Sequence, residues 1–316
     1  MRHTLLVDAS SLYKRSHAVN GNYYTEEFGN ITGVLMSLIT LRTLVKKLAV
    51  NKIVFVWDGQ NNGKLRNNIV SNYKSTRLHK SFTTKIILDD KDIRKEEANK
   101  ESLLRTKIAL QNIIEELFIR QVIASDEIEA DDLISVYCSL YHSTEKITVY
   151  TGDFDLTQMC QYSDSIKVYL ANVKKLICKD NFYTEYGYDH RNVAIIKAFC
   201  GDDSDNIYGV KGLGTDGKSF VKMFPKLKEE PVSIDYILEE TDRLIKERKD
   251  NKKKPLQVLE NIAQGLNKDE SVVGKDLYIN NLKIIDLLQR ICLFIMNYKT
   301  DAYNSVDLRF MWLDYR

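Results

Sequence analysis

The chain has 316 residues, enough for one large domain or for a main domain with a smaller one. Hydrophobic residues make up 44% and charged residues 28%, and no apolar stretch approaches the roughly 20 residues of a membrane-spanning helix. The five cysteines never form a CxxC pair and the start lacks a signal-peptide pattern, which disfavours a disulfide framework, a zinc site and secretion and predicts a cytoplasmic location.

The first sixty residues predict two buried strands with a helix between them. Residues 5–10 (LLVDAS) and 52–59 (KIVFVWDG) are short apolar runs typical of buried strands. Between them, residues 30–50 place apolar side chains at the spacing of an amphipathic helix. This order predicts a βαβ unit, in which the crossover helix makes the two strands parallel.

A polar stretch follows over residues 60–100, and a connection this long in a compact domain is usually functional. Helical spacing returns over residues 101–118. The segment from Arg42 to Lys80 carries nine Lys and Arg residues against one acid. This regional excess of positive charge favours a polyanionic partner such as nucleic acid.

The second half of the chain begins with strands and continues with helices. An apolar-faced segment, LISVYCSLY, follows the string IEADD, and residues 146–155 (KITVYTGDFD) read as a third buried strand. Residues 166–170 and 175–178 are predicted to form a hairpin. From residue 191 onward the chain reads as helical, with a charged helix extension or loop over 243–255.

Carboxylates at the ends of the apolar runs are the strongest functional signal. The nine acids of this kind are Asp8, Asp58, Glu129, Asp131, Asp132, Asp153, Asp155, Asp202 and Asp205. The carboxyl ends of parallel strands meet at one edge of a sheet, where ligands bind. Acids gathered there repel one another unless a hard cation such as Mg²⁺, which prefers oxygen ligands, neutralises them. The pattern predicts a metal-dependent enzyme that acts on phosphates, although each acid alone has the alternative of a helix cap or loop anion.

Taken in order, IEADD, TGDFDL and GDDSDNIYGVKGLG resemble the motifs of the 5′→3′ exonuclease and flap endonuclease family. The similarity extends to the stand-alone phage enzymes that remove RNA primers and runs from Asp8 to about Phe220. It implies a PIN-like, Rossmann-like α/β fold with a mostly parallel sheet flanked by helices. It also implies a nuclease domain over 1–197 with a helical arch at about 78–105. A helical DNA-binding domain over 198–316, with a helix-turn-helix hairpin at about 205–220, would complete the chain.

The resemblance implies that two Mg²⁺ ions, which Mn²⁺ can replace, serve the hydrolysis of a phosphodiester bond. The tighter ion is implied at four acids of the first three motifs, namely Asp8, Asp58, Glu129 and Asp131. The second ion is implied at the remaining acids, namely Asp153, Asp155, Asp202 and Asp205. Asp132 would serve either site or both.

Catalytic and DNA-binding residues are implied by the same resemblance. Lys74 would be the main electrostatic catalyst and Arg77 a phosphate clamp, and Lys197 matches a family lysine near the metals. The implied DNA contacts are Tyr73, Arg66, Gly212, Gly214 and Lys218, with a potassium ion at the hairpin. Tyr208, where the family has proline, and the extra residues 215–217 depart from the hairpin pattern.

The implied function is structure-specific hydrolysis of 5′ flaps, nicks and RNA-primer ends during DNA replication and repair. The expected substrates are branched or nicked duplex DNA and RNA–DNA hybrids, and the expected recruiting partner is a single-strand-binding protein or sliding clamp. We expect a monomer that binds no membrane and works in the cytoplasm, that of the host if a phage encodes it. The alternatives are a PIN-type ribonuclease and an inactive DNA-binding relative. The string GVKGLG and the YK-xx-R element formed by Tyr73, Lys74 and Arg77 argue against the ribonuclease. Retention of all four second-site acids argues against the inactive relative.

Overall fold

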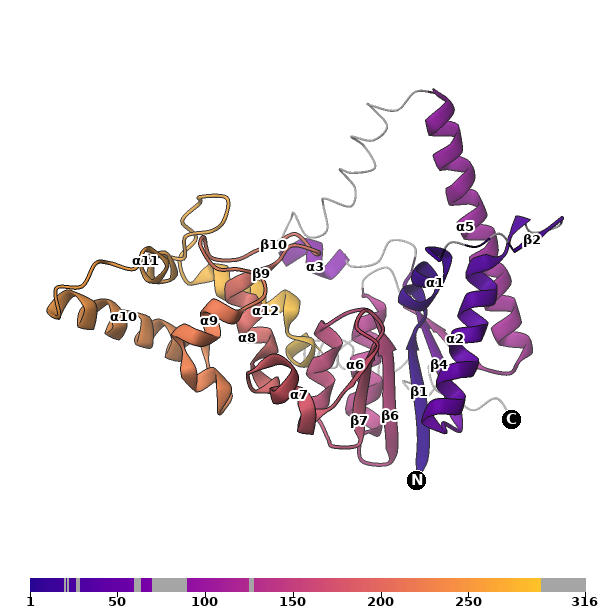
Figure 1. Cartoon of the computed structure of the whole chain (residues 1–316), viewed down its shortest axis with the longest axis horizontal. Helices are drawn as coiled ribbons and strands as arrows, with labels where there is room; N and C mark the ends of the chain where they lie inside the picture. Colours follow the sequence, from indigo (N-terminus) through magenta and orange to yellow (C-terminus); the bar gives the residue numbers. More distant parts are fainter. Residues whose placement is uncertain are drawn as a thin grey trace, which may run out of the picture. The chain divides into compact units, whose positions relative to one another are not determined.

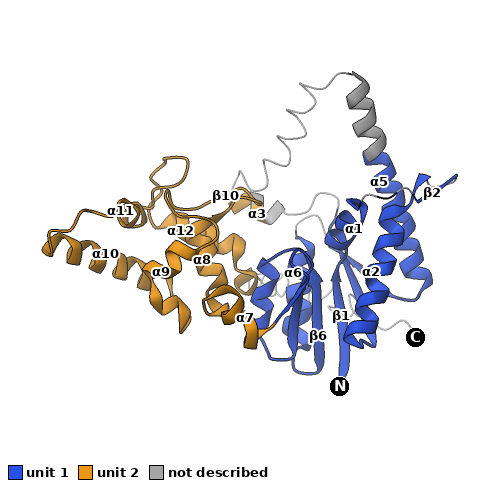
Figure 2. Cartoon of the chain, in the orientation of Figure 1, with its two compact units in different colours: residues 1–64, 81–177, 291–316 blue, residues 65–80, 178–290 orange. Residues whose placement is uncertain are grey.

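The computed structural model describes residues 1–19, 21, 23–26, 29–59, 64–69, 90–124 and 128–290, with the backbone alone at 64, 65, 67 and 90–99. The chain divides into two compact units, shown in blue and orange in Figure 2. The first comprises residues 1–64, 81–177 and 291–316, and the second comprises 65–80 and 178–290. The functional division at residue 197 stays a prediction.

The first unit is built on a six-stranded sheet with the order β5-β4-β1-β6-β7-β8 (Figure 1). All neighbouring pairs are parallel except β7 and β8, which form the expected antiparallel hairpin. The strands are β1 (Arg2–Asp8), β4 (Lys52–Trp57), β5 (Arg120–Ile123), β6 (Glu145–Thr151), β7 (Ile166–Leu170) and β8 (Lys175–Ile177). The predicted α/β fold with a mostly parallel sheet is therefore confirmed.

Helices pack against both faces of this sheet. On one face, α1 (Ala9–His17), α2 (Thr32–Leu48) and the second half of α5 (Asp90–Glu116) share a core with alternate residues of β1 and β4. Intervening strand residues such as Leu6 and Val54 are fully buried on the opposite face. The helix α6 (Ala130–Tyr141) contacts β1, β4 and β6 there. A short 3₁₀ helix, η1 (Asp155–Gln161), follows β6, and the hairpin β2 (Tyr24–Thr25) and β3 (Gly29–Asn30) precedes α2.

Two sequence expectations for the first unit are borne out at the level of whole elements. The crossover helix expected over 30–50 is α2. The helical spacing over 101–118 belongs to the 27-residue helix α5, which begins earlier, at Asp90. The sequence patterns do not predict the helix α1. Its first turn is capped by Asp8, and in the sequence Asp8 reads as part of the preceding strand.

The second unit is mostly helical. Its helices are α3 (Lys64–Ile69), α7 (Lys179–Tyr186), η2 (His190–Asn192), α8 (Val193–Cys200), α9 (Lys218–Met223), η3 (Pro225–Lys228), α10 (Ile234–Asp250), α11 (Gln257–Gln264) and α12 (Asp276–Ile285). Among the described residues, no helix is long and apolar enough to cross a membrane.

The expectation that the chain is helical after residue 191 is wrong directly after α8. The strands β9 (Gly201–Asp202) and β10 (Ile207–Tyr208) form an antiparallel pair directly after α8. Two glycines permit this turn, because a Cβ on Gly209 would lie 2.2 Å from the carbonyl carbon of Cys200, and Gly201 has a φ of +80°. Such a close backbone approach leaves no periodic signal in the sequence.

Candidate active site

Asp8 lies at the carboxyl end of β1 and begins the site. Its Oδ1 accepts a hydrogen bond from the Ser11 amide at 2.9 Å, which caps α1, and its Oδ2 accepts one from the Thr151 hydroxyl at 2.9 Å. The side chain is buried, with 7% of the residue exposed. A strand that ends in an aspartate and turns at once into a helix thus fixes this carboxylate between two strands.

Asp58 follows the neighbouring strand β4 and connects it to the IEADD motif. Its amide donates to the Ser10 hydroxyl at 3.1 Å, and its Oδ1 accepts from the Ala130 amide at 3.0 Å. Ala130 is the first residue of α6, and the residue before it, Glu129, caps that helix and is almost fully buried. The Glu129 amide donates to the Asp132 carboxylate at 2.9 Å. Asp58 and the start of α6 are therefore held together by hydrogen bonds between segments far apart in the sequence.

Asp153 lies just beyond β6, on the other side of β1. Its amide donates to the Thr151 hydroxyl oxygen at 2.9 Å, and its Oδ1 accepts from the Asp155 amide at 2.8 Å. Since the Thr151 hydroxyl also donates to Asp8, this one side chain joins the two acids. Thr151 was missed in the sequence, where it reads only as the last buried residue of a strand.

Of the strand-end acids (Asp8, Asp58 and Asp153), Asp8 is the one on which the charges of the other two act. Burial raises the pKa of Asp8 to about 7, and repulsion from Asp58 and Asp153 adds to it, while hydrogen bonds from Ser11 and Thr151 act in the opposite direction. A carboxyl group with this pKa is only partly ionised near neutral pH. A cation beside it would favour its charged form.

The donor chemistry fits a hard divalent cation. Every candidate ligand is a carboxylate, and Mg²⁺ prefers oxygen ligands and retains part of its water shell. In the described part of the chain, no three His, Cys, Asp or Glu side chains already converge on one metal position. The acids of the first unit accept hydrogen bonds from amides and a hydroxyl instead, as described above for Asp8, Asp58 and Asp153.

The second unit holds its own acid group at the end of α8. The ammonium of Lys197 lies 2.6 Å from the Asp202 carboxylate, and both side chains are largely buried. Burial alone would raise the pKa of Asp202, but Lys197 and hydrogen bonds from Ser204 hold it at about 2. Asp205 is also buried, with 8% of the residue exposed. Lys197 is thus the charge partner of one of the acids assigned to the second metal.

The hairpin residues of the second unit divide into positions open to solvent and positions used for packing. Gly212 has a φ of +94°, whereas a Cβ on Gly214 would meet only the Asp216 carboxylate at 3.2 Å. By contrast, a Cβ on Gly217 would lie 2.5 Å from the Ile196 side chain. The amide of Lys218 donates to Asp216 at 3.2 Å. Gly214 is therefore free to face a ligand, and Gly217 is required for packing.

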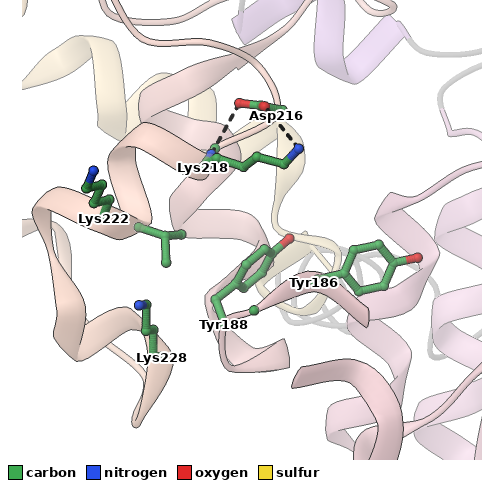
Figure 3. Close-up of a pocket in the computed structure, with 9 residues that line it drawn as sticks. Tyr186, Tyr188, Asp216, Lys218, Lys222 and Lys228 are labelled. Carbon is green, nitrogen blue, oxygen red and sulfur yellow. Dashed lines mark hydrogen bonds and ion pairs between the residues drawn. The ribbon is translucent and has the colours of Figure 1, made fainter. Parts of the chain in front are cut away.

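The extra residues of the hairpin help to line a pocket. Asp216 and Gly217 border a cavity of about 400 Å³ together with Tyr188 and Lys222 (Figure 3). The ammonium of Lys218 lies 3.8 Å from Asp216, and both side chains are exposed. The departure from the family spacing therefore changes the surface beside α9 and leaves the acids of this unit untouched.

Three of the implied residues, Tyr73, Lys74 and Arg77, lie outside the described residues, as do residues 78–89 of the expected arch. Residues 90–105 of that segment belong to α5. Arg66 lies in α3 and is 5% exposed, so most of its surface is covered by the protein itself.

Comparisons with known proteins agree with this architecture. Residues 3–187 match the profile of the 5′-3′ exonuclease N-terminal resolvase-like domain. The 5′-3′ exonuclease of Bacillus subtilis (strain 168) is 30% identical over 251 residues, which cover 77% of this chain and 75% of that protein. The chain belongs to the 5′-3′ exonuclease family. It is therefore a nuclease, and its resemblance to this family is confirmed.

Other members and solved structures extend the comparison. The 5′-3′ exonuclease of Buchnera aphidicola subsp. Schizaphis graminum (strain Sg) is 26% identical over 229 residues, 71% of each chain. The bacteriophage T5 flap endonuclease, solved with DNA and metal ions, shares the fold with a TM-score of 0.70 at 17% identity, over 95% of this chain and 94% of that one. The T5 5′-exonuclease with bound zinc has a TM-score of 0.65 at 18% identity and covers 92% and 91%.

Proposed function

We propose that this exonuclease hydrolyses phosphodiester bonds at 5′ flaps, nicks and RNA-primer ends, using two Mg²⁺ ions. The observation that carries the proposal is the position of Asp8 between Asp58 and Asp153 at the carboxyl ends of three adjacent parallel strands. A fold-sharing flap endonuclease has been solved with DNA and metal ions, which supports the substrate class.

The residues proposed to hold the metals contribute through position and charge. Asp8, Asp58, Glu129 and Asp131 would bind the tighter ion. The second ion would be bound by Asp153, Asp155, Asp202 and Asp205, with Asp132 shared. When bound, the ions would lower the pKa of a water molecule and stabilise the developing charge on the phosphate and leaving oxygen.

The protein's own hydrogen bonds keep these carboxylates oriented. The Thr151 hydroxyl restrains Asp8 relative to Asp153, and the Ala130 amide restrains Asp58. Each bond leaves other carboxylate lone pairs available, because an ionised carboxylate has about four acceptor positions. The arrangement thus limits rotation of the acids while leaving oxygens for a cation, and such pre-organisation lowers the cost of assembling the reacting groups.

Other roles are proposed from the family resemblance. Lys74 would stabilise charge at the scissile phosphate, Arg77 would hold a phosphate, and Tyr73 would stack on a terminal base. Gly212, Gly214 and Lys218 would contact the duplex, and Arg66 would contact a further phosphate. Potassium binding at the hairpin, a monomeric state, a cytoplasmic location and recruitment by a single-strand-binding protein or sliding clamp stay predictions.

The decisive experiment uses a 5′-labelled flap on duplex DNA with Mg²⁺, with EDTA as the control and a matched single-stranded RNA as the competing substrate. We expect cleavage near the flap junction only with the metal. Cleavage of the RNA without cleavage of the flap would instead indicate a PIN-type ribonuclease. Flap binding with no cleavage in any divalent metal would indicate an inactive DNA-binding relative.

A further inference from the structure

One cation beside the strand-end acids has no ionic partner among the described residues. The ammonium of Lys107, in α5, lies 5.3 Å from the centre of the Trp57 ring, and Trp57 directly precedes Asp58. The side chain is half-buried. Within the described ranges, no carboxylate lies within the 4.0 Å of an ion pair and no acceptor is hydrogen-bonded to this ammonium. Neither charge pattern nor motif singled out this lysine in the sequence.

Hydrogen bonds attach α5 to α1 just before Lys107. The hydroxyl of Tyr13, on α1, donates to the Leu103 carbonyl at 3.0 Å and is also hydrogen-bonded to the Thr106 hydroxyl. Tyr13 and Thr106 are both buried. Because Thr106 is adjacent in sequence, the backbone at Lys107 cannot shift without breaking this contact with α1.

A second set of hydrogen bonds, one helical turn later, attaches α5 to the strands and includes the Trp57 ring over which Lys107 lies. The Trp57 indole N–H donates to the Gln121 side-chain oxygen at 2.9 Å. The Gln121 amide group in turn donates to the Gln111 carbonyl of α5 at 2.8 Å. Strand β4, strand β5 and α5 are thereby joined, so Lys107 is held over Trp57 by contacts on both sides of it.

Charges of both signs act on this lysine, together with the cost of its burial. Burial lowers the pKa of Lys107, the charge of Asp58 raises it, and the nearby ammonium of Lys14 on α1 lowers it. The charges of Lys107 and Lys14, from different helices, therefore act on each other, and Asp58 offsets part of this repulsion. Burial of an ammonium that makes no ion pair is unfavourable, and a phosphate beside Lys107 would offset that cost further.

We propose that Lys107, assisted by Lys14, contacts a backbone phosphate of the nucleic-acid strand beside Asp58 and positions that strand for hydrolysis. The inference rests on the proposed nucleic-acid substrate but not on the metal count. A phosphate suits the site because the single charge of a lysine ammonium is enough to attract it. The paired N–H donors of an arginine are not required. The competing explanation is that Lys107 serves only to stack on Trp57 and stabilise the fold.

The test compares Lys107→Met with Lys107→Arg and with a control, Lys146→Met. Methionine keeps the apolar stem on Trp57 and removes the charge, whereas arginine keeps the charge. Lys146 is an exposed lysine at the opposite, amino-terminal part of β6 in the same unit. Thermal unfolding of each variant reports on folding, so a loss of stacking and a loss of phosphate contact are separated.

Binding of a fluorescent flap DNA is measured in EDTA over a series of salt concentrations. For Lys107→Met we expect the slope of log K against log salt to fall by about 0.7–0.9, and affinity to fall roughly fivefold to tenfold at about 0.1 M salt. Lys107→Arg should retain the wild-type slope. An unchanged slope in folded Lys107→Met, or an equal change in Lys146→Met, overturns the proposal.

Cleavage by the wild-type protein in Mg²⁺ is scored separately. A wild type that binds flap DNA without cleaving it contradicts the proposed function, while the salt slopes still decide the role of Lys107. If the wild type binds no nucleic acid, both proposals fail. Where cleavage occurs, Lys107→Met should raise KM more than it lowers kcat, because the contact is made before the reaction.

Discussion

Replacing Asp8 by asparagine should stabilise the metal-free protein at neutral and alkaline pH. The side chain is buried and its pKa is raised to about 7, first by burial and also by the charges of Asp58 and Asp153. A carboxyl group whose pKa is higher in the folded than in the unfolded state stabilises the fold fully only below its unfolded pKa. That contribution is lost as pH rises toward 7. The asparagine of the Asp8→Asn variant would carry no charge at any of these pH values.

The magnitude follows from the shift. A pKa near 7 against a model-compound value of 3.8 corresponds to at most roughly 4 kcal/mol at pH 8. Between pH 5 and pH 8, the advantage of Asp8→Asn over the wild type should grow by about 2–3 kcal/mol. The hydrogen bonds need not be lost, because the asparagine oxygen can accept from Ser11 and the Thr151 hydroxyl can rotate to accept from the amide group.

The assay is chemical unfolding of both proteins in EDTA at several pH values from 5 to 8, repeated with excess MgCl₂. Comparing the two proteins at each pH cancels the titration of the groups that do not interact with Asp8. Mg²⁺ should stabilise the wild type, and the gain should be larger at pH 8 than at pH 5, whereas Asp8→Asn should gain much less. A stability difference that does not vary with pH, or a wild type that becomes relatively more stable as pH rises, would refute the reasoning.

Three further predictions test the remaining parts of the site. The Asp153→Asn variant should cleave at least roughly a hundredfold more slowly while its flap binding stays measurable, because the lost charge acts mainly in the transition state. A near wild-type cleavage rate in Mg²⁺ would show that this residue is not a metal ligand. The Gly214→Val variant should keep the wild-type melting temperature and bind duplex DNA more weakly, with unchanged binding to single strand. The Gly209→Ala variant should instead unfold more easily, because the new Cβ would lie 2.2 Å from a backbone atom. If folded Gly214→Val binds duplex with wild-type affinity, this position is not part of the interface. Lys197→Met should cost about 3 kcal/mol at pH 7, since Asp202 would lose its buried partner. The pKa of Asp202 is depressed to about 2, so its contribution is present above the unfolded value of 3.8 and lost as pH falls toward 2, and urea unfolding should show the variant converging on the wild type there.

Local sequence patterns were sufficient for three central strands of the sheet, for two of its helices and for the family. Apolar runs that end in aspartate predicted β1, β4 and β6, because a few neighbouring residues are enough to show both a buried strand and the point where it ends. Helical spacing predicted α2 and most of α5 for the same reason. The order of the acidic motifs indicated a nuclease, which the family match confirms.

The tertiary structure decided which acids lie on neighbouring strands and how strongly they interact. The sheet order places Asp8 between Asp58 and Asp153, and the bond between Thr151 and Asp8 joins residues 143 positions apart. Periodicity carries no information about such pairs, because they depend on strand order and side-chain packing. Burial likewise raises the pKa of Asp8 and lowers the pKa of Lys107. Chain composition fixes the number of charges, but only the folded surroundings determine the free energy of holding each group in its charged form.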